Sequence, residues 1–206
     1  MPSEADFTVN KKVKVHLNQI TDYPKTDKIE LEINPSKESE FTMSLRIPFW
    51  SEQLCVKVNG EEIKDVERGC YLNLKRQWKK GDRISLQFDL RARLLEMNNA
   101  QAILRGPVVM ARDSRFNDGF VDEASNIIGE NGFVELIPVE NPTFSWMAFK
   151  VESVLGTGLE GNDAARIIHV CDFSSAGNNW DPAQRYRVWL PKTLNVMHMP
   201  YRSYNR

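Results

Sequence analysis

Several features that would assign this sequence to a special class of protein are missing. Its 206 residues contain three cysteines, Cys55, Cys70 and Cys171, too few and too scattered for a disulfide framework or a Cys-x-x-Cys metal clip. No stretch approaches the roughly 20 apolar residues of a membrane span. The net charge is −1, without the basic excess typical of nucleic-acid binders. We therefore expect neither a membrane nor a nucleic acid as a partner.

The amino terminus lacks the pattern of a signal peptide. Residues 1–10 carry acids where a basic segment and then an apolar segment would stand. We expect no signal peptide in this chain, and the localisation stays open, because a longer parent protein that is periplasmic or secreted would carry its signal elsewhere. Hydrophobic residues make up 41% of the chain, which is enough for a globular core.

What the sequence does contain is a regular β pattern. Apolar residues alternate with polar ones along two segments, 41–47 and 84–90, as expected of strands with one buried face. Asn59-Gly60 is the pair that best tolerates the positive φ angles of a type I′ hairpin turn, and Gly81-Asp82 marks a second turn. The pattern predicts an all-β protein built from antiparallel, jelly-roll-like β-sandwiches.

The predicted strands extend over the whole chain and suggest two modules. They are Lys12–Leu17, Lys28–Ile33, Phe41–Ile47, Cys55–Val58, Tyr71–Leu74, Ile84–Leu90, Ala102–Ala111, Phe133–Val139, Phe144–Lys150, Arg166–Phe173 and Arg185–Leu190. The hairpin pattern stops near Arg93–Asn99, so we expect a first sandwich module over residues 1–95 and a second over 96–206. Residues 117–132 and 156–164 are expected to be surface loops, with a short helix at Asp122–Ile127 as the alternative.

A series of motifs carries a resemblance to a known family. In chain order they are Q-x-T-x-Y-P (Gln19–Pro24), L-R-I-P-x-W (Leu45–Trp50), V-N-G-E (Val58–Glu61), Gly69 with Tyr71, W-x-x-G-D (Trp78–Asp82), L-R-G-P-V-V (Leu104–Val109) and R-V-W-L-P (Arg187–Pro191). Together they resemble the region that follows the catalytic barrel in glycoside hydrolase family 127, which includes β-L-arabinofuranosidases. The likeness runs from about Val13 to Pro191.

The resemblance implies an accessory role. In such enzymes a helical (α/α) barrel holds a zinc ion on cysteines and a glutamate, beside a cysteine nucleophile. This sequence has no helical barrel, and none of its cysteines matches a catalytic position. The resemblance thus implies a non-catalytic β-sandwich region without cofactor or metal. Such a region would support the catalytic barrel of a parent glycosidase, or it would support oligomerisation of the protein, for example as a homodimer. The chain alone is not expected to be catalytic.

Other groups of reactive side chains have plainer interpretations. His169, Cys171 and Asp172 lie close together, but their apolar neighbours favour a buried strand over a zinc site that lacks further ligands. The acidic pairs Glu61-Glu62 and Asp122-Glu123 sit among polar neighbours and are expected to be solvated surface rather than the paired carboxylates of a glycosidase.

One segment favours ligand binding. Asn178, Asn179, Trp180 and Asp181 lie between two predicted strands, in a loop where a tryptophan has little reason to be core. Sugar rings stack on exposed aromatic side chains, while amides and carboxylates bind the hydroxyls. The alternative to the accessory role is therefore an autonomous carbohydrate-binding module that recognises plant glycans through these four residues. Trp50 and Trp78, in contrast, are predicted to be core or end caps of a sandwich.

Overall fold

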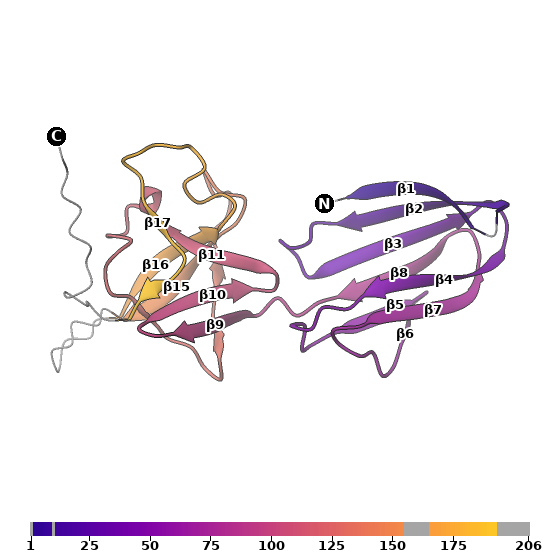
Figure 1. Cartoon of the computed structure of the whole chain (residues 1–206), viewed down its shortest axis with the longest axis horizontal. Coiled ribbons are helices and arrows are strands. Elements are labelled where there is room, and N and C mark those ends of the chain that lie inside the picture. Colours follow the sequence, from indigo (N-terminus) through magenta and orange to yellow (C-terminus); the bar gives the residue numbers. More distant parts are fainter. Residues whose placement is uncertain (1, 10, 155–164, 193–206) are drawn as a thin grey trace. The chain divides into compact units, whose positions relative to one another are not determined.

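The computed structural model describes residues 2–9, 11–154 and 165–192. Contacts divide the chain into two compact units, Met1–Leu90 and Arg91–Arg206. Among the described residues nearly all regular structure is β-strand, and the helical exception is the 3₁₀ turn η1 (Ser114–Phe116). The all-β, antiparallel fold class is confirmed (Figure 1).

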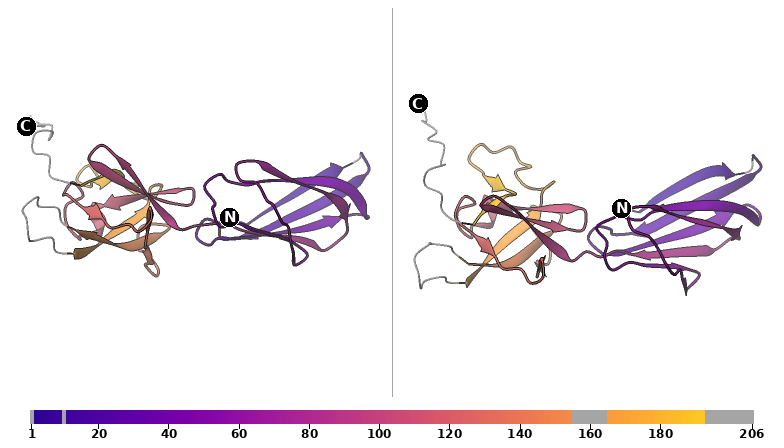
Figure 2. Two further views of the ribbon diagram at one scale, coloured as in Figure 1. Left: turned by 90° about the horizontal axis from the view of Figure 1, so that it is seen from below. Right: turned by 60° about the horizontal axis from the view of Figure 1, so that its bottom comes forward.

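The first unit is a sandwich of a large and a small antiparallel sheet. The large sheet has the strand order β1-β2-β3-β8-β5-β6 and the small sheet consists of β4 and β7. The strands are β1 (Ser3–Val9), β2 (Val13–Thr21), β3 (Lys28–Pro35), β4 (Ser39–Arg46), β5 (Cys55–Val58), β6 (Glu61–Glu62), β7 (Tyr71–Trp78) and β8 (Asp82–Gln87). Figures 1 and 2 show β4 and β7 lying across one face of the large sheet.

The two turns expected from the sequence are present. Val58 pairs with Glu61, so Asn59 and Gly60 form a two-residue hairpin loop with φ angles of 53° and 87°. The second turn joins β7 to β8, and its Asp82 carboxylate accepts hydrogen bonds from Lys79 N at 2.9 Å and Asn59 Nδ2 at 2.9 Å. These bonds tie the β5–β6 and β7–β8 turns together.

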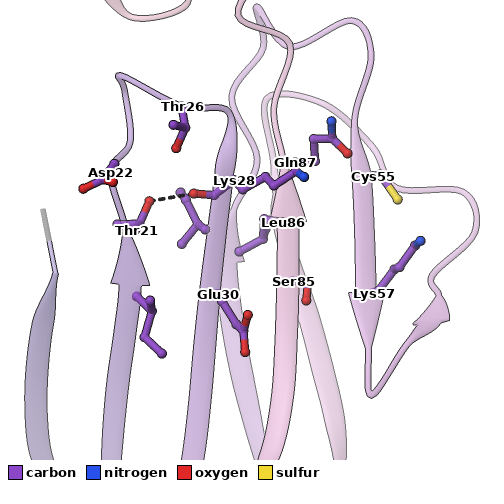
Figure 3. A pocket seen from close by; sticks show the side chains of 12 residues that line it. Thr21, Asp22, Thr26, Lys28, Glu30, Cys55, Lys57, Ser85, Leu86 and Gln87 are labelled. Atoms are coloured by element: carbon purple, nitrogen blue, oxygen red, sulfur yellow. Dashed lines mark hydrogen bonds between the residues drawn. The ribbon is translucent and has the colours of Figure 1, made fainter.

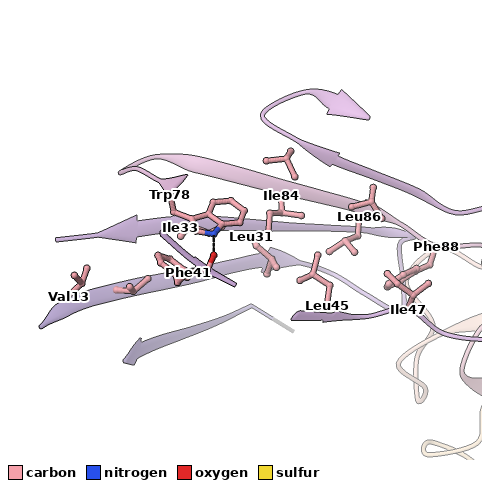
Figure 4. Close-up of a cluster of buried hydrophobic side chains, with 13 residues drawn as sticks. Val13, Leu31, Ile33, Phe41, Leu45, Ile47, Trp78, Ile84, Leu86 and Phe88 are labelled. Atoms are coloured by element: carbon pink, nitrogen blue, oxygen red, sulfur yellow. Dashed lines mark hydrogen bonds between the residues drawn. The ribbon is translucent and has the colours of Figure 1, made fainter. Parts of the chain in front are cut away.

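The core of the first unit lies between its two sheets. Ile33 and Ile84 of the large sheet and Trp78 of the small one are each fully buried, in a cluster that also contains Phe41 (Figure 4). The Trp78 indole donates a hydrogen bond from Nε1 to the Phe41 carbonyl oxygen at 3.0 Å. A large apolar ring is thereby buried without leaving its N–H unsatisfied.

The second unit is one continuous antiparallel sheet with three side branches. Its main path has the order β12-β15-β16-β11-β10-β9-β13, while β14 pairs with β15, β17 with β11 and β18 with β10. The strands are β9 (Ala92–Met97), β10 (Ala100–Arg105), β11 (Val108–Asp113), β12 (Asn126–Ile127), β13 (Phe133–Val134), β14 (Ile137–Pro138), β15 (Ala148–Val154), β16 (Ala165–Asp172), β17 (Tyr186–Arg187) and β18 (Leu190–Pro191).

This sheet curls around its own core. Ile127 on β12 and Val134 on β13 stand at opposite ends of the strand path, yet both belong to one buried cluster with Ile103, Phe149 and Ile168. Such shared packing requires the two halves of the sheet to face each other, as in a sandwich or a nearly closed barrel. Figure 2 shows this curvature from two sides.

Several expectations about individual elements are wrong or incomplete. The single strand predicted over Ala102–Ala111 is a hairpin of β10 and β11, because Gly106 adopts a φ of 55° and Pro107 cannot donate to a ladder. The alternative of a short helix at Asp122–Ile127 does not hold, since this segment begins with a turn and a bend and ends with the whole of β12. Edge strand β1, mostly exposed, was not predicted.

The domain boundary stays a proposal. The expected division after residue 95 falls within β9, five residues beyond the end of the first compact unit at Leu90.

No helix in the described part of the chain is long and apolar enough to cross a membrane. Residues 156–164, expected to be a loop, lie outside the described residues.

Candidate functional site

The four residues expected to bind a ligand lie in one loop of the second unit, between β16 and β17. Trp180 is 91% exposed, and its backbone has a φ of 57°, in the left-handed region that few non-glycine residues adopt. Its N–H donates to the Gly177 carbonyl at 3.3 Å, which closes the turn. The loop therefore holds the indole out in solvent.

The base of this loop is fixed by a buried carboxylate, Asp172. One oxygen, Oδ1, accepts the Met147 N–H at 2.8 Å, while Oδ2 accepts the N–H and the hydroxyl of Ser175 at 3.0 and 2.8 Å. The Ser174 hydroxyl adds a further bond at 2.5 Å. A buried carboxylate is costly unless it is hydrogen-bonded in this way, so the bonds hold the start of the loop in one conformation.

A second buried carboxylate, Asp113 at the end of β11, fixes the middle of the loop. Its Oδ2 accepts the Gly177 N–H at 2.9 Å and Arg115 Nη2 at 2.7 Å. Burial by itself would raise the pKa of Asp113, but the hydrogen bonds from Arg115 and Gly177 outweigh it and hold the pKa below its ordinary value. The carboxylate stays charged at neutral pH.

Arg115 connects this carboxylate to the predicted ligand residues. Its Nη2 also donates to the Ser175 carbonyl at 2.8 Å, and its Nη1 donates to the Asn178 side-chain oxygen at 2.9 Å. The guanidinium lies over the Phe144 ring, 4.0 Å from its centroid. The side-chain oxygen of Asn178 is therefore engaged in holding the loop.

Two further aromatic rings flank the loop. An added Cβ at Gly177, where φ is 63°, would lie 2.6 Å from two atoms of the Tyr186 ring, so only glycine allows this ring to pack on the loop backbone. Tyr186 in turn contacts Phe173, with ring centroids 5.9 Å apart, and both side chains are about half exposed. Neither was singled out in the sequence, where both fall within expected strands, Arg166–Phe173 and Arg185–Leu190.

The four predicted residues thus divide into two kinds. Asn178 and Asp181 shape the loop, since Asp181 Oδ1 accepts the Ala183 N–H at 2.8 Å. All four residues are exposed, and the Trp180 residue is 91% exposed. A ligand at this loop would meet the Trp180 indole first, and the polar contacts would come from the exposed side chains beside it.

His169 borders a cluster of charged side chains that includes Asp118 and Arg112. Its Nδ1 lies 3.1 Å from Asp118 Oδ2, and its ring stacks on Phe116 with centroids 5.2 Å apart. Burial raises the pKa of the neighbouring Cys171 thiol to about 12, with smaller contributions from the Asp113 and Asp172 carboxylates. Within the described ranges, no group of three or more His, Cys, Asp or Glu side chains is placed to hold a metal ion.

The same cluster corrects the expectation for Glu123. We predicted a solvated carboxylate, but Glu123 Oε1 accepts a hydrogen bond from the fully buried Arg112 at 2.6 Å and also contacts Arg166. The other member of the acidic pair, Asp122, is exposed, and its Oδ1 accepts a hydrogen bond from Arg187 Nε at 2.6 Å. The sequence signal that was missed is Arg112 itself, a cation at the end of an apolar strand that requires buried acceptors.

Comparisons with known proteins place the chain among similar sequences and folds. Residues 1–90 match the family model described as "Beta-L-arabinofuranosidase, GH127 middle domain". No curated protein sequence matches the chain. A solved structure described as a glycoside hydrolase shares 25% identity and a TM-score of 0.71 over 91% of this chain.

Two further solved structures share the fold. One is a GH127 β-L-arabinofuranosidase from Geobacillus Stearothermophilus T6, with 19% identity and a TM-score of 0.72 over 91% of this chain. The other is described as a GH127 β-arabinofuranosidase, with 23% identity and a TM-score of 0.73 over 92%. The chain spans only 34%, 32% and 33% of the three structures' lengths, about a third in each case.

Proposed function

We propose that this chain is a non-catalytic accessory region that supports the catalytic barrel of a parent glycosidase. Its motifs and fold resemble those of the β-sandwich region of glycoside hydrolase family 127-like proteins. The observation that carries the proposal is the combination of a middle-domain match over residues 1–90 with coverage of only about a third of the similar structures. The remaining two thirds of such proteins would hold the catalytic part.

The surfaces available for this role are apolar side chains left in solvent. In the first unit Phe49 and Tyr71 are 71% and 63% exposed, and in the second Phe120 is 83% exposed. Large exposed apolar side chains indicate contact with another protein surface when they gather in patches. A barrel would cover such side chains in the parent protein, and a second copy of the chain would do so in a homodimer, which stays a prediction.

Joining the chain to a barrel tests the supporting role. The catalytic barrel of a family 127 enzyme would be prepared alone, with its own β-sandwich region, and with this chain in place of that region. We expect the barrel alone to melt at a lower temperature than either joined form, because its contact face is exposed to water. A barrel that melts at the same temperature in all three forms would contradict the supporting role.

A second candidate function, an autonomous carbohydrate-binding module for plant glycans, is favoured by the Trp180 loop. Trp180 is 91% exposed, and the loop is fixed at its base by the buried carboxylate of Asp172 and in its middle by that of Asp113. A preformed loop lowers the entropic cost of binding, because little is left to order when a sugar stacks on the ring. This rigidity supports a binding role more than exposure alone does.

Replacing Trp180 by alanine tests this candidate. Because the side chain is exposed, we expect the stability to change by less than about 0.5 kcal/mol. Loss of the stacking surface is expected to weaken glycan binding by about tenfold, equivalent to roughly 1.4 kcal/mol. Isothermal titration calorimetry with arabinan-rich plant glycans measures the affinities of the wild type and the variant. Equal affinities of the wild type and the variant, or no binding by the wild type, would exclude the Trp180 loop as a sugar site.

A further inference from the structure

The outer face of the large sheet in the first unit contains a groove of about 500 Å³. It lies on strands β2, β3, β5 and β8, where the side chains of Lys28, Lys57, Ser85 and Gln87 are exposed (Figure 3). Its volume falls within the range of roughly 300–1,000 Å³ that is common for small-molecule sites. At one end the Thr21 hydroxyl donates to the Lys28 carbonyl at 2.7 Å and fastens β2 to β3.

The strand register explains why this face is hollow. Ser85 on the central strand β8 pairs with Glu30 on one side and with Lys57 on the other, so the three side chains project from one row. In the next row Gln87 stands between Lys28 and Cys55. The short Ser85 and Cys55 side chains thus lie among longer ones, which leaves a trough with raised sides.

The lining residues supply both kinds of hydrogen-bonding group, and two of them are held in place. The Glu30 carboxylate receives Arg83 Nη1 at 2.7 Å, and Gln87 Nε2 donates to Asp27 Oδ2 at 2.7 Å. Lys28 and Lys57 add ammonium donors. Side chains that are already oriented lose less entropy when a ligand binds them.

The charges of the lining narrow the class of ligand. Two lysines, Lys28 and Lys57, stand against two carboxylates, Glu30 and Asp22, so the lining as a whole is close to neutral. A phosphate-rich ligand would meet repulsion from the acids, and a cation would meet it from the lysines. Ile20, which is 48% exposed, adds an apolar edge. The lining therefore suits a neutral molecule with many hydroxyls and an apolar ring face.

We propose that this groove is a second, separate saccharide-binding site, formed by Glu30, Lys57, Ser85 and Gln87. Neutral oligosaccharides match its alternating donors and acceptors, and the ring C–H groups match the apolar edge. The site belongs to the first unit and uses no residue of the Trp180 loop, so either site can bind when the other fails. It also does not depend on whether the chain supports a catalytic barrel.

Titration of the isotope-labelled full chain by NMR tests the proposal. Neutral arabino-, xylo- and gluco-oligosaccharides would be added to millimolar concentration while the backbone amides of Glu30, Lys57 and Ser85 are followed. We expect at least one oligosaccharide to shift these amides saturably. If none does, the groove is not a saccharide site. Shifts confined to amides of the Trp180 loop would overturn the proposal equally, while leaving the second candidate function intact.

Filling the groove provides the matched variant. Ser85→Tyr places a ring in the trough at an exposed strand position and is expected to weaken binding by about tenfold or more. Thr42→Tyr, at an exposed position of β4 on the other sheet, is the control and should bind as the wild type does. Unchanged affinity in a folded Ser85→Tyr would overturn the proposal. If Ser85→Tyr fails to fold, Lys57→Ala replaces it, with weaker binding expected and unchanged binding contradicting the site.

Discussion

Replacing Trp78 by alanine is expected to lower the melting temperature of the first unit by more than about 10 °C. Trp78 is fully buried between the two sheets, and its Nε1 bond to the Phe41 carbonyl would be lost together with the ring. Large-to-small substitutions of buried aromatic residues cost about 3–5 kcal/mol, a large part of the roughly 5–15 kcal/mol that stabilises a typical domain. Differential scanning calorimetry measures the shift.

Two variants separate the causes of this loss. Trp78→Phe keeps much of the apolar volume but removes the indole donor, so its cost should be clearly smaller than that of Trp78→Ala. Tyr71→Ala removes an aromatic ring that is 63% exposed in the same small sheet and should leave the transition within about 0.5 kcal/mol of the wild type. If Trp78→Ala melted like Tyr71→Ala, Trp78 would not be a central part of the sandwich core.

The second large effect is expected at Asp113, the buried carboxylate under the Trp180 loop. Asp113→Ala leaves the Arg115 guanidinium and the Gly177 N–H without this acceptor. Removing one partner of a buried pair costs about 3–5 kcal/mol. We expect the stability of the second unit to fall by that order, and the Gly177 amide to exchange with solvent much faster, as measured by hydrogen exchange.

The contribution of Asp113 should also depend on pH in a defined direction. Its pKa is lower in the folded protein than in the unfolded chain, so folding favours the charged form. The stabilisation is complete above the unfolded value of about 4 and disappears as the pH falls through the folded pKa. The melting temperatures of the wild type and Asp113→Asn should therefore converge in acid. A constant difference across that range would show that the Asp113 charge does not hold the loop.

Much of the first unit could be predicted from the sequence, because its signals are local. Alternating apolar residues predicted β4 and β8, and the Asn59-Gly60 pair predicted the β5–β6 hairpin. Strand β1 was missed although its apolar residues Ala5, Phe7 and Val9 alternate with polar ones; it is an edge strand whose side chains are mostly exposed. The hairpin formed by β9 and β10 was interpreted as a domain boundary. The reason is that its turn, Asn98-Asn99, follows strand β9, whose last residues are exposed.

The second unit shows the limit of such reasoning. The sequence places Trp180 in a loop but leaves its exposure open. The support of that loop depends on Asp113, which lies 64 residues before Gly177, the residue whose N–H it accepts at 2.9 Å. The burial of Arg112 against Asp118 and Glu123 likewise arises only when β11 and the loop after η1 fold together. The groove on the large sheet depends on the register of four strands, which alternation alone does not fix.

The central claim is that this chain is an accessory region that does not itself hydrolyse glycosides. Incubating the purified chain with an aryl β-L-arabinofuranoside, beside an intact family 127 enzyme as the positive control, tests it most directly. We predict no release of the aryl group above the buffer blank, at any chain concentration. Release that rises in proportion to the amount of chain and persists through further purification would contradict the account.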